Sequence, residues 1–157
     1  MSKDDQKPLQ PLEVGSIMDA QGESLPVDVR LDLSELTLSG GYTPFIAPVA
    51  VTGQVANRAG ITTFSYTAQL SMDLRCDRCL TSFHKDEAIP VTHVLVRQLS
   101  QEDNDDFLVL PSGRLDVRET VFSDIVLWLP FRQLCSEDCK GLCAHCGADL
   151  NETTCNC

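Results

Sequence analysis

Basic side chains are scarce in this sequence. Its 157 residues include 12 lysines and arginines against 23 aspartates and glutamates, which gives a formal net charge of -11. Proteins that bind naked nucleic acid normally carry a basic surface, because contacts with phosphates supply most of their affinity. The charge therefore argues against direct binding of RNA or DNA and favours cationic partners.

Long apolar runs and enzyme motifs are also missing. No segment approaches the roughly 20 apolar residues needed to cross a bilayer. The start, "MSKDDQKPLQPLEVGS", lacks the apolar run and the cleavage site of a secretory signal, so we expect a cytoplasmic protein. There is no G-x-S-x-G, phosphate loop or H-E-x-x-H. We therefore expect no catalytic residue and no enzyme.

Alternation of apolar and polar residues predicts a sheet. It is strict over residues 64–76, clear over 27–33 and weaker over 49–55, which is the pattern of half-buried strands. Residues 89–99 are rich in β-branched side chains and are also expected to form a strand, and "FLVLPSG" at 107–113 a short strand with a turn. The acidic run "SQEDNDD" at 100–106 is expected to be an exposed loop.

The segment "LDVRETVFSDIVLWLP" changes to the period of a helix. Asp116 and Glu119 have the spacing of a capping box, and Pro130 is expected to end the helix. The apolar residues that share one stripe are Val117, Val121, Ile125 and Trp128. The predicted fold class is therefore α+β, a mostly antiparallel sheet with one packed amphipathic helix.

What the sequence does have is eight cysteines in four close pairs. Zinc in structural sites prefers four thiolates in a tetrahedron, and C-x2-C holds two of them at the required separation. Gly147, directly after "CAHC", can adopt the positive φ that lets the backbone curl around the sulfurs. The nearest cysteines downstream complete a predicted zinc site of Cys143, Cys146, Cys155 and Cys157.

The remaining two pairs suggest a second zinc site. Cys76 and Cys79 lie between two strand-like segments, so they are expected in the turn of a hairpin, where they can meet Cys135 and Cys139. Such a site would clamp the C-terminal segment onto the sheet. We therefore expect one or two Zn²⁺ ions and two parts, a β-rich core of residues 1–134 and a zinc-binding C-terminal segment of residues 135–157.

Other interpretations of these residues stay open. All eight cysteines can be free thiols, since unpaired buried cysteine is common. A dithiol redox pair normally opens a helix, whereas no helical period follows "CDRC". His84 and His145 can replace a cysteine as ligands or assist a nucleophile, although exposed polar residues beside the cysteines are the simpler expectation. His93 is expected to be a packed or surface side chain of its strand.

Three stretches together resemble a known family. "CDRCL", "LDVRETVFSDIVLWLP" and "CKGLCAHCGADLN" with the closing "CNC" are similar to the YceD family, the large ribosomal RNA subunit accumulation proteins of bacteria and plastids. The resemblance spans about residues 70–157. It implies a ribosome biogenesis factor needed for large-subunit (23S) rRNA, without an established enzymatic activity. Some relatives lack most C-terminal cysteines, which implies a stabilising or docking role for that cluster.

The charge and the resemblance together favour an indirect mode of action. An acidic protein suits a basic ribosomal or RNA-processing protein as its partner better than naked rRNA. Direct rRNA contact remains possible if a few basic residues near the cysteines form a local patch; these are Arg75, Arg78, Lys85, Arg132 and Lys140. The alternatives are a zinc-bearing protein interaction module of unrelated purpose and a thiol redox protein.

Overall fold

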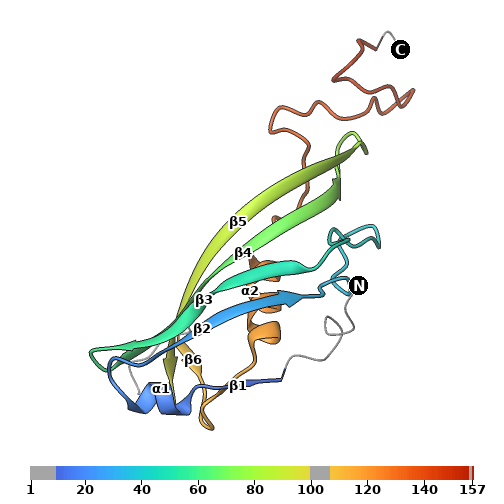
Figure 1. The fold of residues 1–157 in the computed structure, drawn as a ribbon. Coiled ribbons are helices and arrows are strands. Elements are labelled where there is room, and N and C mark those ends of the chain that lie inside the picture. The colour runs from blue at the N-terminus through green and yellow to red at the C-terminus, as the bar shows by residue number, and fades with distance from the viewer. Residues whose placement is uncertain (1–9, 100–106, 156) are drawn as a thin grey trace.

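A computed structural model of the chain describes residues 10–99, 107–155 and 157. The predicted loop at 100–106 and most of the stretch tested for a secretory signal lie outside these residues. Figure 1 shows a long, coiled sheet with one helix lying against it. In the described part of the chain, no helix is long and apolar enough to cross a membrane.

The main sheet has the strand order β2-β3-β4-β5-β6. Its strands are β2 (Ser24–Leu31), β3 (Val49–Arg58), β4 (Ile61–Arg75), β5 (Ser82–Val96) and β6 (Phe107–Val109). The first four pair antiparallel, which confirms the predicted sheet, whereas β6 pairs parallel with β5. β5 begins seven residues before the stretch predicted from its β-branched residues, because its polar first half is held by pairing with β4.

A second, smaller sheet and a short helix were not expected from the sequence. β1 (Leu12–Glu13) pairs antiparallel with β7 (Arg114–Leu115), and α1 (Gly15–Asp19) follows β1. Pairing of two-residue strands leaves no periodic signal, because alternation needs several residues to be visible.

One face of β4 forms the centre of the core. Along this strand alternate side chains are buried, from Thr62 through Phe64 and Ala68 to Leu74, while their neighbours face outward. The same apolar cluster contains three residues of α2 (Val117–Trp128), namely Val117, Val121 and Ile125. The helix thus covers the apolar face of the sheet (Figure 1).

The ends of α2 follow from local chemistry. The Asp116 carboxylate accepts a 3.0 Å hydrogen bond from the Glu119 amide, so it caps the helix and forms one half of the predicted capping box. Leu129 has an extended backbone, because the residue before a proline is disfavoured in helical conformation. The outward side of the helix is not purely polar, since Leu127 is 84% exposed. After α2 the chain leads toward the tip of the β4–β5 hairpin (Figure 1).

The β4–β5 hairpin extends beyond the rest of the sheet. β3 pairs with β4 only as far as Gln69, so from Leu70 to Arg75 β5 is the only strand beside β4 among the residues that the structure describes. The loop between β2 and β3 supports this ribbon: Pro44 accepts from the Asp73 amide at 3.0 Å, and the Tyr42 hydroxyl accepts from the Arg75 amide at 2.9 Å. The tip of the ribbon is where the first two cysteines lie.

Candidate metal centres

The eight cysteines gather in two groups of four. Cluster A consists of Cys76, Cys79, Cys135 and Cys139, and cluster B of Cys143, Cys146, Cys155 and Cys157. Within each cluster the four sulfur atoms lie within 4.8 Å of one another. These are the groups that the sequence spacing predicted. All eight residues are free cysteines in this structure.

Cluster A begins in the turn between β4 and β5, as expected for Cys76 and Cys79. The turn is closed by two hydrogen bonds of 2.9 Å, from the Leu80 amide to the Cys76 carbonyl and from the Cys76 amide to the Thr81 carbonyl. Leu80 has a φ of 63°, a left-handed conformation that non-glycine residues rarely adopt. The turn therefore curls back so that both thiols point to the same side.

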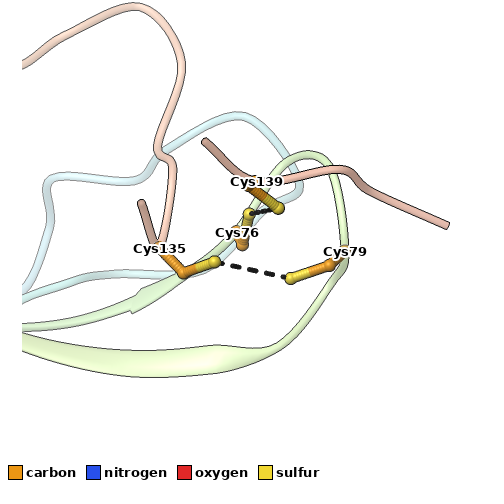
Figure 2. Close-up of side chains that lie close together, drawn as sticks. All are labelled: Cys76, Cys79, Cys135 and Cys139. Carbon is orange, nitrogen blue, oxygen red and sulfur yellow. Dashed lines mark hydrogen bonds between the residues drawn. The ribbon is translucent and has the colours of Figure 1, made fainter. Parts of the chain in front are cut away.

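The C-terminal segment completes cluster A. The Asp77 amide donates to the Gln133 carbonyl at 2.7 Å, and the Asp77 carboxylate accepts from the Gln133 amide at 2.7 Å. This pair of bonds fastens the segment to the hairpin two residues before Cys135. Figure 2 shows the result: Cys139 lies 3.6 Å from Cys76 and Cys135 lies 3.7 Å from Cys79, between sulfur atoms. Only Cys135 of this cluster is exposed.

Arg78 also holds the two segments together. Its guanidinium donates to the Cys139 carbonyl at 3.0 Å and more weakly to the Glu137 carbonyl at 3.5 Å. Two other basic side chains of the predicted patch are engaged as well, since Arg75 lies over the Tyr42 ring at 5.1 Å and Lys85 pairs with Glu87 at 3.1 Å. The basic residues near the hairpin tip thus have neighbours within the chain.

Cluster B is built by local turns of the C-terminal segment. The Gly147 amide donates to the Cys143 carbonyl at 2.9 Å, and Gly147 has a φ of 75°, as its position after the second cysteine predicted. A bridge between Leu142 and Asp149 closes the turn. The Cys155 sulfur lies 3.3 Å from that of Cys146 and 3.2 Å from that of Cys143. Cysteines of this cluster are half-buried or exposed.

Electrostatics differ among the thiols of one cluster. Burial opposes ionisation of Cys76, but backbone amides of Cys79, Cys135 and Arg78 outweigh it and lower its pKa to about 6. Amides of Cys146 and His145 lower the pKa of Cys143 to about 6. In each cluster another thiol is harder to ionise: desolvation first, then Cys79, raises the pKa of Cys135 to about 12, and hydrogen bonding to Cys155 and Cys146 raises that of Cys157 to about 11.

The donor set fits zinc. Four thiolates around one Zn²⁺ at about 2.3 Å are separated from each other by about 3.8 Å. The sulfur contacts of 3.6 and 3.7 Å in cluster A are close to this value, and those of cluster B range from 2.9 to 4.0 Å. Four sulfurs this close cannot all be anionic without a compensating cation. Both clusters can therefore hold a metal ion.

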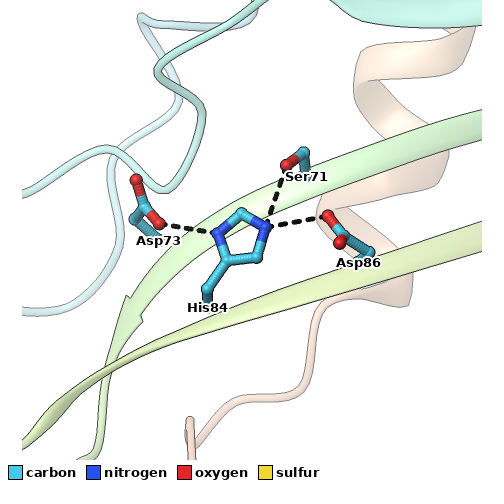
Figure 3. Close-up of polar contacts among 4 residues, drawn as sticks. All are labelled: Ser71, Asp73, His84 and Asp86. Atoms are coloured by element: carbon cyan, nitrogen blue, oxygen red, sulfur yellow. Dashed lines mark hydrogen bonds and ion pairs between the residues drawn. The ribbon is translucent and has the colours of Figure 1, made fainter.

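The histidines do not belong to either cluster. Figure 3 shows His84 between two carboxylates, with Nδ1 2.7 Å from Asp73, and Nε2 2.9 Å from Asp86 and 3.1 Å from the Ser71 hydroxyl. Hydrogen bonds to Asp73 and then Asp86 raise the pKa of His84. Both ring nitrogens are thus engaged. His145 is exposed, and its backbone amide, 3.4 Å from the Cys143 sulfur, is the group that touches the cluster.

His93 joins the helix to the sheet. Its Nε2 lies 2.7 Å from the Asp124 carboxylate of α2, and the same oxygen accepts a 2.5 Å hydrogen bond from the Tyr66 hydroxyl of β4. Burial and then the Asp124 hydrogen bond raise the pKa of Tyr66 above its usual range. His93 is therefore a packed side chain, one of the two roles that were expected for it. The contact was not predictable, since nothing in the sequence relates Asp124 to β4 or β5.

Comparison with known proteins identifies a family. The family model described as "Large ribosomal RNA subunit accumulation protein YceD" matches residues 64–157, a range that contains all eight cysteines and α2. A protein of Mycobacterium leprae (strain TN) that is named "Uncharacterized protein ML1660" is 31% identical over 81 residues, which are 48% of this chain and 36% of that protein. The match thus spans about a third of this curated relative. No solved structure matches the chain.

Proposed function

Because the chain belongs to the YceD family of large ribosomal RNA subunit accumulation proteins, we propose that it is a ribosome biogenesis factor that supports the accumulation of 23S rRNA. The observation that carries this proposal is the family match over residues 64–157. Those residues contain most of the β4–β5 hairpin, all of α2 and both cysteine clusters.

We also propose that each cluster binds one Zn²⁺ ion, held by its four cysteines. When bound, the metal would supply a rigid tetrahedral crosslink, which is the role of zinc that is enclosed by four protein ligands. Such a site has no open coordination position for a substrate. This supports a binding protein rather than an enzyme. Its docking surface would be the end of the molecule that carries the two clusters.

A basic protein is the proposed partner. Residues 71–87 and 131–157, which form the metal-bearing end, contain eight aspartates and glutamates but five lysines and arginines. Four thiolates around one Zn²⁺ carry a net charge of about -2 for each cluster, so metal binding leaves this end more acidic. An acidic, rigid surface is complementary to a basic ribosomal or RNA-processing protein.

The rRNA role is tested by depletion. Cells depleted of the protein should lose 23S rRNA relative to 16S rRNA, and the wild-type chain should restore the ratio. A matched pair of variants then tests the role of the metal-bearing end: one lacks cluster B (Cys143→Ser with Cys146→Ser) and one changes the outer face of the sheet (Thr67→Ser). An unchanged 23S to 16S ratio on depletion would sink the proposal.

The partner is tested by a salt series. Affinity for purified basic large-subunit proteins should fall steeply as salt rises, because the Debye length shrinks to about 8 Å at physiological ionic strength. Naked 23S rRNA fragments should bind weakly under the same conditions. Tight RNA binding that is abolished by Arg75→Ala with Lys85→Ala would instead establish direct RNA contact. Arg78 is left unchanged in this test because it holds Cys139 in place.

A further inference from the structure

Asn151 connects the two clusters. It lies in the loop between Cys146 and Cys155, two cysteines of cluster B. Its side chain nevertheless reaches cluster A: Nδ2 donates to the Cys139 sulfur at 3.3 Å, and Oδ1 accepts from the Lys140 amide at 2.9 Å. One amide group thus contacts a ligand of cluster A and the residue directly after that ligand.

The orientation of this side chain is determined by its own loop. Both the backbone amide and Nδ2 of Asn151 donate to the Asp149 carboxylate at 2.9 Å. Next to it, the Leu150 amide donates to the Gly141 carbonyl at 3.0 Å. The loop of cluster B therefore grips residues 139–141 at three points, two through the Asn151 side chain and one through the backbone.

Cys139 is held from both sides. Arg78, from the hairpin turn, binds its carbonyl, while Asn151 binds its sulfur. Cys139 is 4% exposed, so its sulfur has little access to water, and the Asn151 amide supplies it with a hydrogen bond in place of water. An N–H group that points at a thiolate stabilises its negative charge and orients it toward the metal, and removing such an outer contact typically costs 10–100-fold in metal affinity.

We propose that Asn151 is a positioning residue that couples the two metal sites. An ion in cluster B would hold closed the loop from which Asn151 contacts Cys139, and so it would slow the loss of an ion from cluster A. Coupling of binding free energies is reciprocal, so an ion in cluster A also strengthens binding in cluster B. The inference rests on the proposed zinc sites, but not on the rRNA role.

The test follows zinc release from the full-length chain to the chromogenic chelator 4-(2-pyridylazo)resorcinol. The variant Cys143→Ser with Cys146→Ser, which lacks cluster B, identifies the phase of cluster A. Asn151→Ala should speed that phase about tenfold, the lower end of the effect of outer contacts. Asn151→Asp should speed it at least as much, because it loses the donor to Cys139 and to the Asp149 carboxylate and places a negative charge beside both. Thr153→Ala is the matched control, since Thr153 bonds the Asp149 carbonyl of the same loop.

Combining Asn151→Ala with the removal of cluster B tests whether Asn151 acts through cluster B. In the chain without cluster B, release from cluster A should already be about tenfold faster, and adding Asn151→Ala should change it less than twofold. Equal rates for Asn151→Ala and Thr153→Ala would overturn the inference, as would a full effect of Asn151→Ala without cluster B. Two zinc ions released independently would overturn the coupling alone, whereas a wild-type chain without zinc would overturn the zinc sites as well.

Discussion

The two cysteine clusters use the same local turn in opposite settings. In both, the residue after the second cysteine is in a left-handed conformation and its amide donates to the first cysteine's carbonyl at 2.9 Å, from Leu80 in cluster A and from Gly147 in cluster B. Cluster A, however, joins residues 56 and 63 positions apart, whereas the sulfur contacts of cluster B span 14 positions or fewer. One cluster closes the tertiary structure, and the other closes a loop.

We expect cluster A to contribute more to the stability of the fold than cluster B, and the difference in loop length alone does not account for this. Closing a loop that is roughly five times longer costs only about 1.4 kcal/mol more in free energy, through the entropy of the chain. Burial adds more, because three cysteines of cluster A lie in a small apolar group with Phe83, Leu134 and Leu142 around them. Cluster A should therefore be coupled to the stability of the sheet and cluster B only to the order of its own segment.

The largest effect should follow from removing cluster A. Cys76→Ser with Cys79→Ser should lower the free energy of unfolding by about 2–5 kcal/mol, the range for loss of a native disulfide, which also joins distant parts of a chain. The new hydroxyl groups add to this cost, because Cys76 and Cys79 are buried. Chemical denaturation, monitored by circular dichroism, measures this loss of free energy of unfolding. A core as stable as the wild type would contradict the idea that cluster A clamps the fold.

Removing cluster B should have a smaller and local effect. Cys143→Ser with Cys146→Ser should halve the zinc content and raise hydrogen exchange in residues 140–157, because few large apolar side chains hold this segment. The core should still melt cooperatively and lose no more than about 1.4 kcal/mol of its free energy of unfolding, which corresponds to the tenfold effect on cluster A that is transmitted through Asn151. Elemental analysis and hydrogen exchange check both parts. Unfolding of the whole chain would show that the division into residues 1–134 and 135–157 is wrong.

Substitution of the residue that follows the second cysteine of each turn, Gly147 or Leu80, tests whether the two turns share one geometry. Gly147→Leu should weaken zinc binding in cluster B by about 1–2 kcal/mol, the cost of a left-handed side-chain-bearing residue. No atom lies within 4 Å of a Cβ added there, so the cost is one of backbone conformation. Leu80→Gly removes the same strain from cluster A and should be neutral or slightly stabilising. Competition with a zinc chelator measures both, and equal weakening in the two swaps would disprove the shared turn geometry.

The smallest effect should come from His84, which braces the hairpin below cluster A. Because its folded pKa is raised, the ion pairs with Asp73 and Asp86 stabilise the fold fully below the unfolded pKa of about 6.5 and are lost as pH rises through the folded value. His84→Gln should therefore lower the unfolding midpoint slightly near pH 6 but not at pH 9. Measuring both proteins at each pH cancels the pH dependence of the cysteine clusters, and a pH-independent difference would exclude the ion pairs.

Much of the fold could be predicted from local patterns. Strict alternation predicted β4, and the Asp116 cap and Pro130 marked the ends of α2. The polar first half of β5 was missed because residues such as Lys85 and Asp86 carry no strand signal of their own; pairing with β4 places them in the sheet. β6 was expected as a strand, but its parallel pairing with β5 is a contact between strands that a pattern within one strand does not reveal.

The sequence by itself determined the features that depend on residues a few positions apart: the strands, the limits of the helix, the turn at Gly147 and the close cysteine pairs. It also predicted which pairs meet, but not what holds them together, because contacts over 56 or more positions depend on where the chain returns. Only the tertiary structure decided that the β4–β5 hairpin extends beyond β3 and that Asp77 fastens the chain after α2 to its tip. It alone also decided that Arg78 and Asn151 hold Cys139, since a polar side chain reveals its partner only once the backbone has placed both.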